Sequence, residues 1–319
     1  MKAIVLTKPG GVENLQLTEI PVPVPGDRDV LIQNKAISIN PVDTFVRGNE
    51  AALKSILGLK EGESPVILGW DISGVVTETG KSVTRFKKGD EVFGLVRFTG
   101  HGKAYAGYTT APEDQVALKP AGVSHEDAAA ATLAALTAWQ SLVTYAKIKK
   151  GDKVLIHSAA GGVGHYAVQI AKHFGAYVIG TSSPKNKDFV LALGADQHID
   201  YTSQRFEEAV TDADIILDSV AEPGHLDRSL AALKQGGRLI SIVAHFTDEA
   251  LLEKIKSKHV FAHRLGVISN GEDMRSIAGL LGNGQLRSHI SETYTFDKIA
   301  AAHTSVASGR TKGKVILIP

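Results

Sequence analysis

The chain has 319 residues, a formal net charge of +1, and 43% hydrophobic and 22% charged residues. This composition is typical of a globular protein of roughly two domains, and the small charge gives no electrostatic basis for binding nucleic acid or an acidic membrane. The absence of cysteine excludes disulfides, thiolate metal sites and cysteine nucleophiles. Because no apolar run is long enough to span a membrane and no signal peptide is recognisable, we expect a cytoplasmic protein.

Residues 1–122 alternate short apolar runs with clusters of glycine, proline and aspartate. Turn clusters at 25–27 and 88–90 are examples. This spacing predicts short strands and few helices, and so a compact β unit that forms a partly closed barrel. From Ser124 the pattern changes, since a capping sequence and an alanine-rich run predict helix to about residue 148.

The stretch from Lys153 to Ser183 predicts a strand, a glycine-rich turn, a helix and a second strand. The turn matches the pattern A-x-G-x-x-G and stands between a strand and a helix, a context typical of dinucleotide-binding folds. There the turn and the helix N-terminus hold a pyrophosphate. The alternative is a tight connection without a ligand. Gly161 would let the backbone approach the pyrophosphate, and Gly164 would let the helix lie close to the strand.

The end of the second strand indicates which dinucleotide binds. An NAD site usually has Asp or Glu there, about 20 residues beyond the turn, to bind the ribose 2′-hydroxyl. This chain has hydroxyls and an ammonium at 181–187, and no acid before Asp188. Such groups suit a 2′-phosphate, which a carboxylate would repel, so we expect NADP(H). The same residues also fit a polar helix start, with Ser183 as N-cap and Pro184 at the first helical position.

Strands and helices continue to alternate after this unit. Strands are expected within 195–201, 214–218, 238–243 and 260–267, and helices within 186–193, 203–210 and 225–233. This rhythm predicts an α/β fold with a doubly wound parallel sheet. The final strand at 314–318 has no helix partner, so we expect it to return to the first β unit. The expected domains are therefore 1–122 with 269–319, and 123–268.

Several further motifs resemble those of one known family. In chain order they are Asn40-Pro41-Val42-Asp43, Gly69-Trp70-Asp71, Gly89-Asp90-Glu91-Val92, Leu136-Thr137-Ala138, Leu193-Gly194-Ala195-Asp196 and Gly313-Lys314-Val315. With them the chain resembles the medium-chain dehydrogenase/reductase superfamily, and within it the zinc-independent quinone oxidoreductase and enone reductase branch. The resemblance implies a Rossmann domain and a discontinuous GroES-like catalytic domain. It also implies homodimers joined by Rossmann edge strands, here about 260–267.

The resemblance also implies the chemistry. Where zinc members of the superfamily place their first Cys and their His, this chain has Asn40-Pro41 and Gly69-Trp70-Asp71, so no metal is expected. The expected reaction is hydride transfer from NADPH to an electrophilic small molecule, either an α,β-unsaturated carbonyl or a quinone. The Asn40 amide is a candidate oxyanion donor and Tyr105 a candidate proton donor, although Tyr105 also reads as strand core. A strict quinone reductase and a non-catalytic NADPH-binding protein are the alternatives.

The remaining candidate residues come from the resemblance. Those expected at the pyrophosphate are Ala160, Gly161, Gly162, Val163 and Gly164. Those expected at the 2′-phosphate are Ser182, Ser183, Lys185 and Asn186. Tyr201 is expected beside the adenosine phosphate, with a loop anchor as the alternative. Thr137 is expected near the nicotinamide amide. Val243 and His245 follow the fifth strand, at the carboxyl end of the sheet where the nicotinamide binds.

Overall fold

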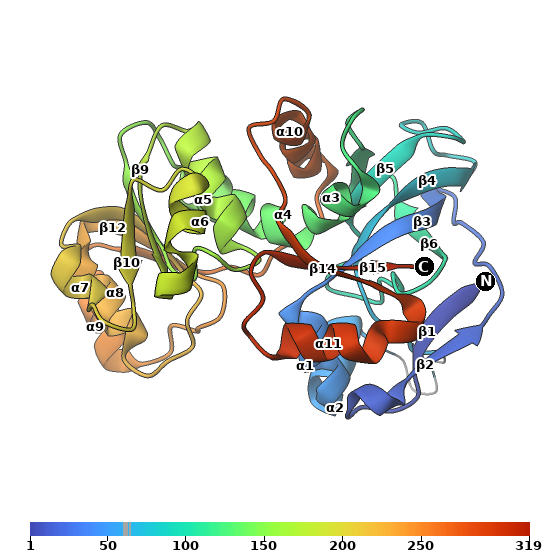
Figure 1. Cartoon of the computed structure of the whole chain (residues 1–319), viewed down its shortest axis with the longest axis horizontal. Helices are drawn as coiled ribbons and strands as arrows, with labels where there is room; N and C mark the ends of the chain where they lie inside the picture. The colour runs from blue at the N-terminus through green and yellow to red at the C-terminus, as the bar shows by residue number, and fades with distance from the viewer. Residues whose placement is uncertain (60–62, 64) are drawn as a thin grey trace. The chain divides into compact units, whose positions relative to one another are not determined.

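The computed structural model describes residues 1–59, 63 and 65–319 (Figure 1). The chain forms two compact units, Met1–Leu136 with Ile268–Pro319 (unit 1) and Thr137–Val267 (unit 2). The first unit is discontinuous. Residues 123–136, grouped with the nucleotide-binding domain in the sequence analysis, belong to unit 1 in this division.

Unit 1 is built on antiparallel strands. A sheet with the order β14-β15-β3-β4-β5-β7 carries β6 against β3, and β1 and β2 form a separate pair. The strands are β1 Lys2–Leu6, β2 Leu15–Glu19, β3 Asp29–Ile39, β4 Asp71–Thr79, β5 Glu91–Leu95, β6 Tyr108–Pro112, β7 Val116–Leu118, β14 Ile290–Thr295 and β15 Lys314–Ile318. The last strand, β15, pairs with β3, with Ile316 opposite Ser38. The expectation that the C-terminal strand returns to the β unit is therefore confirmed.

Short helices flank this sheet. They are α1 Pro41–Gly48, α2 Glu50–Leu57, α3 His125–Ala130, α10 Gly271–Gly282 and α11 Ile299–Ala307, with 3-10 turns at Val12–Asn14 and Phe296–Lys298. Ala129 and Ala130 of α3 pack against Ala36 of β3 and Ile316 of β15. Because alanine side chains are small, they allow the helix to lie close to the sheet. Helix α4, Leu133–Trp139, crosses the residue at which the units divide.

Unit 2 is a six-stranded parallel sheet with the order β10-β9-β8-β11-β12-β13. Its strands are β8 Lys153–Ile156, β9 Tyr177–Ser182, β10 Gln197–Asp200, β11 Ala213–Asp218, β12 Leu233–Ser241 and β13 Phe261–Arg264. Its helices are α5 Gly164–His173, α6 Lys187–Ala192, α7 Phe206–Ala209, α8 His225–Ala232 and α9 Glu249–Ser257, with a π-helix at Gln140–Tyr145 and a 3-10 turn at Pro184–Asn186. This order is that of a Rossmann sheet, so the predicted doubly wound fold is confirmed.

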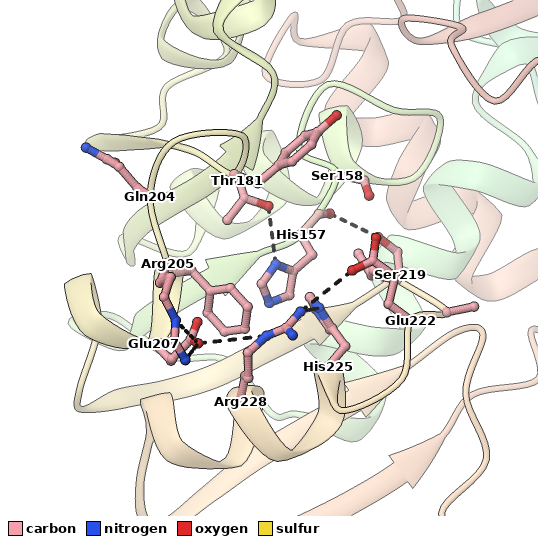
Figure 2. A pocket seen from close by; sticks show the side chains of 14 residues that line it. His157, Ser158, Thr181, Gln204, Arg205, Glu207, Ser219, Glu222, His225 and Arg228 are labelled. Atoms are coloured by element: carbon pink, nitrogen blue, oxygen red, sulfur yellow. Dashed lines mark hydrogen bonds and ion pairs between the residues drawn. The ribbon is translucent and has the colours of Figure 1, made fainter.

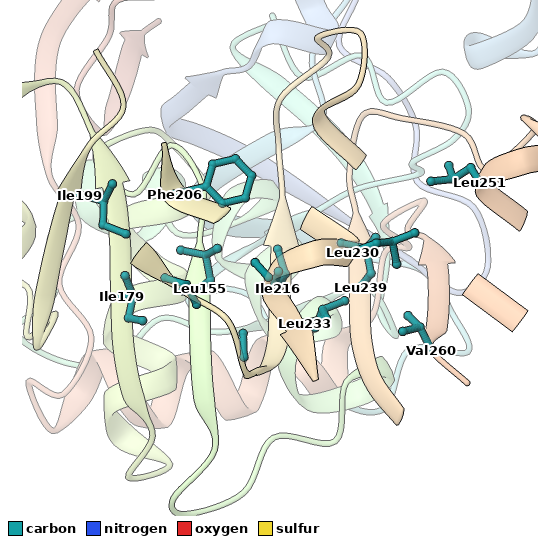
Figure 3. Close-up of a cluster of buried hydrophobic side chains, with 13 residues drawn as sticks. Leu155, Ile179, Ile199, Phe206, Ile216, Leu230, Leu233, Leu239, Leu251 and Val260 are labelled. Carbon is teal, nitrogen blue, oxygen red and sulfur yellow. The ribbon is translucent and has the colours of Figure 1, made fainter. Parts of the chain in front are cut away.

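The strand order fixes where a ligand can bind. The chain starts at β8, adds β9 and β10 on one side, and then crosses to β11 on the other side of β8. Loops that leave β8 and β11 at their carboxyl ends therefore diverge and leave a crevice, the usual ligand position in open α/β sheets. Figure 3 shows the apolar cluster on the sheet, which includes Leu155, Ile179 and Ile216. Such continuous burial is expected for parallel strands, and this packed core supports the loops at the carboxyl edge of the sheet.

The element boundaries differ from the sequence expectation in a few places. Strand β12 begins at Leu233 and runs through Gly236 and Gly237, whereas the sequence analysis expected a helix to residue 233 and a strand only from residue 238. Helix α9 was missed, although its N-cap signal is plain: the Asp248 side chain accepts from the Leu251 amide at 2.8 Å. Within the described residues, no helix is long and apolar enough to cross a membrane.

Candidate functional site

The glycine turn lies at the carboxyl end of β8 and leads into α5. A Cβ atom on Gly164 would lie 2.2 Å from the Ser158 carbonyl oxygen and 2.8 Å from the Ala159 Cα. Only glycine therefore fits there without a shift of the turn. On Gly161 a Cβ would lie 3.2 Å from the same oxygen. These close contacts bring the start of α5 against the strand, as a dinucleotide-binding turn requires.

The turn also presents unpaired donors. The Gly161 amide donates to the Ser158 carbonyl at 2.8 Å. Within the described part of the chain, the amides of Gly162 and Val163 have no protein acceptor. The first turn of α5 carries no acidic side chain. An anion is the group that such a helix start binds best, so the residues here fit a pyrophosphate. The contacts of Ala160, Gly161, Gly162, Val163 and Gly164 with it stay a prediction.

The hydroxyl and ammonium groups expected at the 2′-phosphate follow β9. Ser183 occupies the N-cap position of the 3-10 turn, and Pro184 its first position, but the Ser183 side chain makes no capping hydrogen bond. Instead its Oγ accepts from Asn186 Nδ2 at 3.4 Å. Lys185 is exposed, and no carboxylate pairs with it among the residues that the structure describes. Ser183 and Pro184 thus occupy the positions of a helix start, and the same positions are compatible with phosphate binding by Ser183 and Lys185.

Ser182 differs from its neighbours because it is only 3% exposed. Its Oγ lies 2.8 Å from Nε2 of His198, which belongs to the adjacent strand β10. Ser182 Oγ also donates to the Ser183 carbonyl at 3.1 Å. The sequence analysis missed His198, because strand pairing, and not sequence spacing, brings it to this place.

A cavity of about 670 Å³ opens at the same edge of the sheet (Figure 2). Residues that follow β8, β10 and β11 line it, together with Thr181 of β9 and side chains from α7 and α8. They are His157, Ser158, Thr181, Tyr201, Gln204, Arg205, Phe206, Glu207, Ser219, Val220, Ala221, Glu222, His225 and Arg228. Of the predicted cofactor residues, Tyr201 lines this cavity with 61% of its surface exposed. Its place beside the adenosine phosphate stays a prediction, with a loop anchor as the alternative.

Aromatic rings form a cluster in the cavity. The ring of His157 lies 4.5 Å, centroid to centroid, from the rings of both Phe206 and His225, and its Nδ1 is 3.2 Å from Thr181 Oγ1. Burial lowers the pKa of His157 well below its usual value, and the nearby His225 and Arg228 act in the same direction. Burial also lowers the pKa of His225. Both rings are therefore neutral near pH 7.

The charged groups of the cavity lie in opposite pairs. Arg205 donates to Glu207 at 2.8 Å, and an Arg228 nitrogen lies 3.7 Å from Glu222. A neutral aromatic interior with compensated charges suits a heteroaromatic ring better than a phosphate. The sequence analysis named Tyr201 alone from this set, since the other residues are brought together only by the packing of α7 and α8 on the sheet.

The residues predicted to contact the nicotinamide lie on two different elements, α4 and the segment after β12. Val243 and His245 follow β12 and are exposed. The amides of Val243 and Ala244 donate to Ser241 Oγ at 3.3 and 2.9 Å, which fixes the path of the chain as it leaves the strand. Thr137 is 5% exposed in α4. The roles of Thr137, Val243 and His245 stay predictions.

Asn40, the candidate oxyanion donor, is held in a charged network in unit 1. It is 2% exposed, and its Nδ2 donates to Asp71 Oδ2 at 2.7 Å. Lys314 Nζ donates to Asn40 Oδ1. The backbone N–H of Asn40 donates to Asp43 Oδ2 at 2.7 Å, as part of a capping box at the start of α1. Burial raises the pKa of Asp43 to about 7. The orientation of the Asn40 amide is thereby fixed, with one Nδ2 hydrogen committed to Asp71.

Tyr105, the candidate proton donor, is fully buried in the same unit. His303 Nε2 lies 3.1 Å from its hydroxyl, and an Arg47 nitrogen lies 3.5 Å from His303 Nδ1. Because a guanidinium only donates, Nδ1 is the acceptor and Nε2 carries the proton that is donated to Tyr105. The hydroxyl also interacts with Asp43, and burial raises the Tyr105 pKa well above its usual value. These contacts make Tyr105 an internal link, and its role as a proton donor to substrate stays a prediction.

The position of the zinc-binding His in metal-dependent relatives holds Trp70 here. This side chain is 1% exposed, and its Nε1 donates to the Gly100 carbonyl at 2.7 Å. Its ring meets Phe98 edge to face at 5.2 Å. Among the described residues there is no group of three or more His, Asp or Glu side chains that could hold a metal ion. The donor set of a catalytic zinc site is thus not assembled in that part of the chain.

The chain also matches known proteins over its length. Residues 26–121 match the alcohol dehydrogenase GroES-like domain, and residues 193–317 match a family described as zinc-binding dehydrogenase. The chain is 34% identical to the 2-methylene-furan-3-one reductase of Solanum lycopersicum, with 100% of this chain and 79% of that protein covered. It is 31% identical to the NADPH-dependent alkenal/one oxidoreductase of Arabidopsis thaliana, with 100% and 80% covered. The structure of the quinone oxidoreductase from Coxiella burnetii matches with a TM-score of 0.90 and 35% identity, over 100% of this chain and 99% of that one.

The glycine turn, the Rossmann strand order and these matches agree. The chain belongs to the medium-chain dehydrogenase/reductase superfamily. Within it, the chain is an oxidoreductase of the branch that contains the quinone oxidoreductases and the alkenal/one oxidoreductases. The family and the fold class predicted from the sequence are confirmed.

Proposed function

We propose that this protein uses NADPH to reduce α,β-unsaturated carbonyl compounds, with quinones as a second class of acceptor. The observation that carries the proposal is the carboxyl edge of the unit 2 sheet. There a glycine turn with unpaired amides stands next to a strand that ends in hydroxyls and an ammonium, with no carboxylate. The relatives named for NADPH-dependent alkenal/one reduction and for quinone reduction support it.

Different residues of the chain would bind different parts of NADPH. The amides of the glycine turn would hold the pyrophosphate, and Ser183, Lys185 and Asn186 the 2′-phosphate. The aromatic cavity beside Tyr201 would take the adenine ring, whose flat heteroaromatic surface suits its neutral walls. Val243 and His245 follow β12 at the same edge, where the nicotinamide half belongs.

When bound, NADPH supplies the hydride. A conjugated acceptor needs less polarisation than a simple ketone, since the charge that develops spreads onto an oxygen that hydrogen-bond donors can stabilise. The fixed Asn40 amide would provide one such donor, its second Nδ2 hydrogen. The chain's own contribution is then mainly to position the reactants and to place donors without a metal.

Turnover tests this proposal directly. Purified protein is mixed with NADPH, or with NADH as the control, and with a 2-alkenal, a cyclic enone or a 1,4-quinone, and the loss of reduced-cofactor absorbance is followed. Faster turnover with NADPH on the alkenal or the enone is the expected result. Turnover on the quinone alone would favour the strict quinone reductase. Tight NADPH binding without turnover of any acceptor would favour the non-catalytic binding protein.

We also propose that the protein is a homodimer joined through β13. This strand is at the end of the sheet order, so one of its edges has no neighbour within the sheet. Phe261 on this strand is 45% exposed, which is the kind of apolar side chain that a partner edge would cover. The domain boundaries at 122 and 269 and the cytoplasmic location likewise remain proposals.

A further inference from the structure

One titratable side chain lies next to the proposed phosphate site without having a part in the proposal above. His198, on β10, contacts Ser182, the last residue of β9, through a 2.8 Å contact between Nε2 and Oγ. The strands pair in parallel with His198 opposite Gly180 and Asp200 opposite Ser182. The imidazole therefore lies on the face of the sheet that Ser182 shares, at the carboxyl end of both strands.

The hydrogen bonds of Ser182 define how the two side chains interact. Its hydroxyl has one proton, and that proton is donated to the Ser183 carbonyl at 3.1 Å. Ser182 Oγ then accepts from His198, so Nε2 carries a hydrogen in this arrangement. His198 thus holds the Ser182 hydroxyl, and through it the backbone of Ser183, where the 2′-phosphate site begins.

The charges around His198 are few. Burial lowers its pKa, Asp200 on the same strand raises it, and Lys187 of α6 lowers it. Asp200 is already engaged, because its Oδ1 accepts from the Thr202 amide at 2.9 Å and its Oδ2 accepts from Ser203 Oγ at 2.8 Å. Asp200 is thus held by hydrogen bonds to other groups but keeps its charge, and an anionic ligand near His198 would add to that negative charge.

We propose that His198 is a positioning and specificity-determining residue for the 2′-phosphate of NADPH, acting through Ser182 and binding a proton when the phosphate binds. This inference rests on the proposed function. A doubly charged phosphate beside the imidazole favours the imidazolium form. By linkage, a group that gains a proton on ligand binding makes that binding tighter as the pH falls. NADH lacks the 2′-phosphate, so its affinity is not expected to share this dependence.

The experiment measures the Kd of NADPH and of NADH by calorimetry at pH 6.5 and 8.5, in two buffers that differ in ionisation enthalpy. For the wild type, NADPH is expected to bind roughly threefold to tenfold more tightly at pH 6.5, with proton uptake, while NADH changes little. His198→Gln keeps a donor near the Nε2 position but does not titrate. In this variant the pH dependence is expected to shrink to the part that comes from the phosphate, whose own second pKa is about 6.

Two comparisons separate the possible outcomes. If His198→Gln keeps the wild-type pH dependence and proton uptake, the inference is overturned and the proposed function is untouched. If the wild type binds NADPH and NADH equally at both pH values, the proposed function fails, and the inference with it. His173→Gln is the matched control, because His173 lies exposed in the last turn of α5, at the opposite end of the sheet. His198→Val removes the donor as well, and is expected to weaken NADPH at both pH values and to leave NADH nearly unchanged.

Discussion

Replacing Gly164 by alanine probes the glycine turn with one carbon atom. The added Cβ would lie 2.2 Å from the Ser158 carbonyl oxygen, against an ordinary contact distance of at least 3.4 Å. The first turn of α5 must therefore move by about 1 Å, and overpacking of this kind costs about 1–3 kcal/mol. The helix propensity of alanine returns at most about 1 kcal/mol of that. We expect a net loss of up to about 3 kcal/mol in the free energy of unfolding of unit 2. NADPH binding is expected to be at least about tenfold weaker, since a 1 Å displacement of donors disrupts a preorganised site.

Denaturant unfolding followed by circular dichroism and NADPH titration by fluorescence measure both effects. Gly279→Ala is the matched control, since its Cβ would meet nothing within 4 Å in helix α10. That variant is expected to gain about 0.5–1 kcal/mol from helix propensity and to bind NADPH normally. If Gly164→Ala unfolds and binds as the wild type does, the close approach of α5 to the turn does not constrain the site, and the reasoning is refuted.

Three further predictions concern charge and assembly. Lys185→Ala is expected to raise the Kd of NADPH about tenfold or more and that of NADH less than about twofold; equal losses in titrations with the two cofactors would mean that Lys185 does not face the 2′-phosphate. For Asp43, burial raises the pKa to about 7, so the folded protein holds more protons than the unfolded chain between about pH 4 and 7, and ionisation in that range destabilises the fold. Asp43→Asn is therefore expected to remove a loss of stability with rising pH, and the comparison is of unfolding midpoints at pH 4.5 and 7; an unchanged slope would contradict it. Phe261→Lys on β13 is expected to convert the proposed dimer into monomers in light-scattering measurements, whereas Leu252→Lys on α9 should not; a variant that stays dimeric would place the interface elsewhere.

The parts of this structure that the sequence predicts best are those with strong local signals. The glycine turn stands out because a helical period follows it directly and buried strands flank it on both sides. The doubly wound parallel sheet of β8 to β13 follows from the alternation of strands and helices, since right-handed crossovers place the strands parallel. The return of β15 to unit 1 follows from its lack of a helix partner.

The parts that the sequence did not predict depend on contacts between distant residues. Arg47 donates to Nδ1 of His303, so Nε2 carries the proton that is donated to Tyr105. No sequence spacing connects these three residues. The contact between His198 and Ser182 depends on the register of β9 and β10, which the sequence does not specify. Strand β12 runs through Gly236 and Gly237, residues that normally end an element. Its pairs with β11 resume, and those with β13 begin, only at Arg238, after a register shift that follows Leu233, and no local pattern reveals this long-range pairing.

The buried Lys314 also bears on the order in which the chain folds. Lys314 lies in β15, near the C-terminus, and its charge offsets that of two buried aspartates from the first quarter of the sequence. Unit 2 is continuous and is complete once residue 267 has been synthesised. Unit 1 lacks both strand β15 and its internal cation until residues 314–318 have been synthesised. We therefore expect unit 2 to fold before unit 1 does.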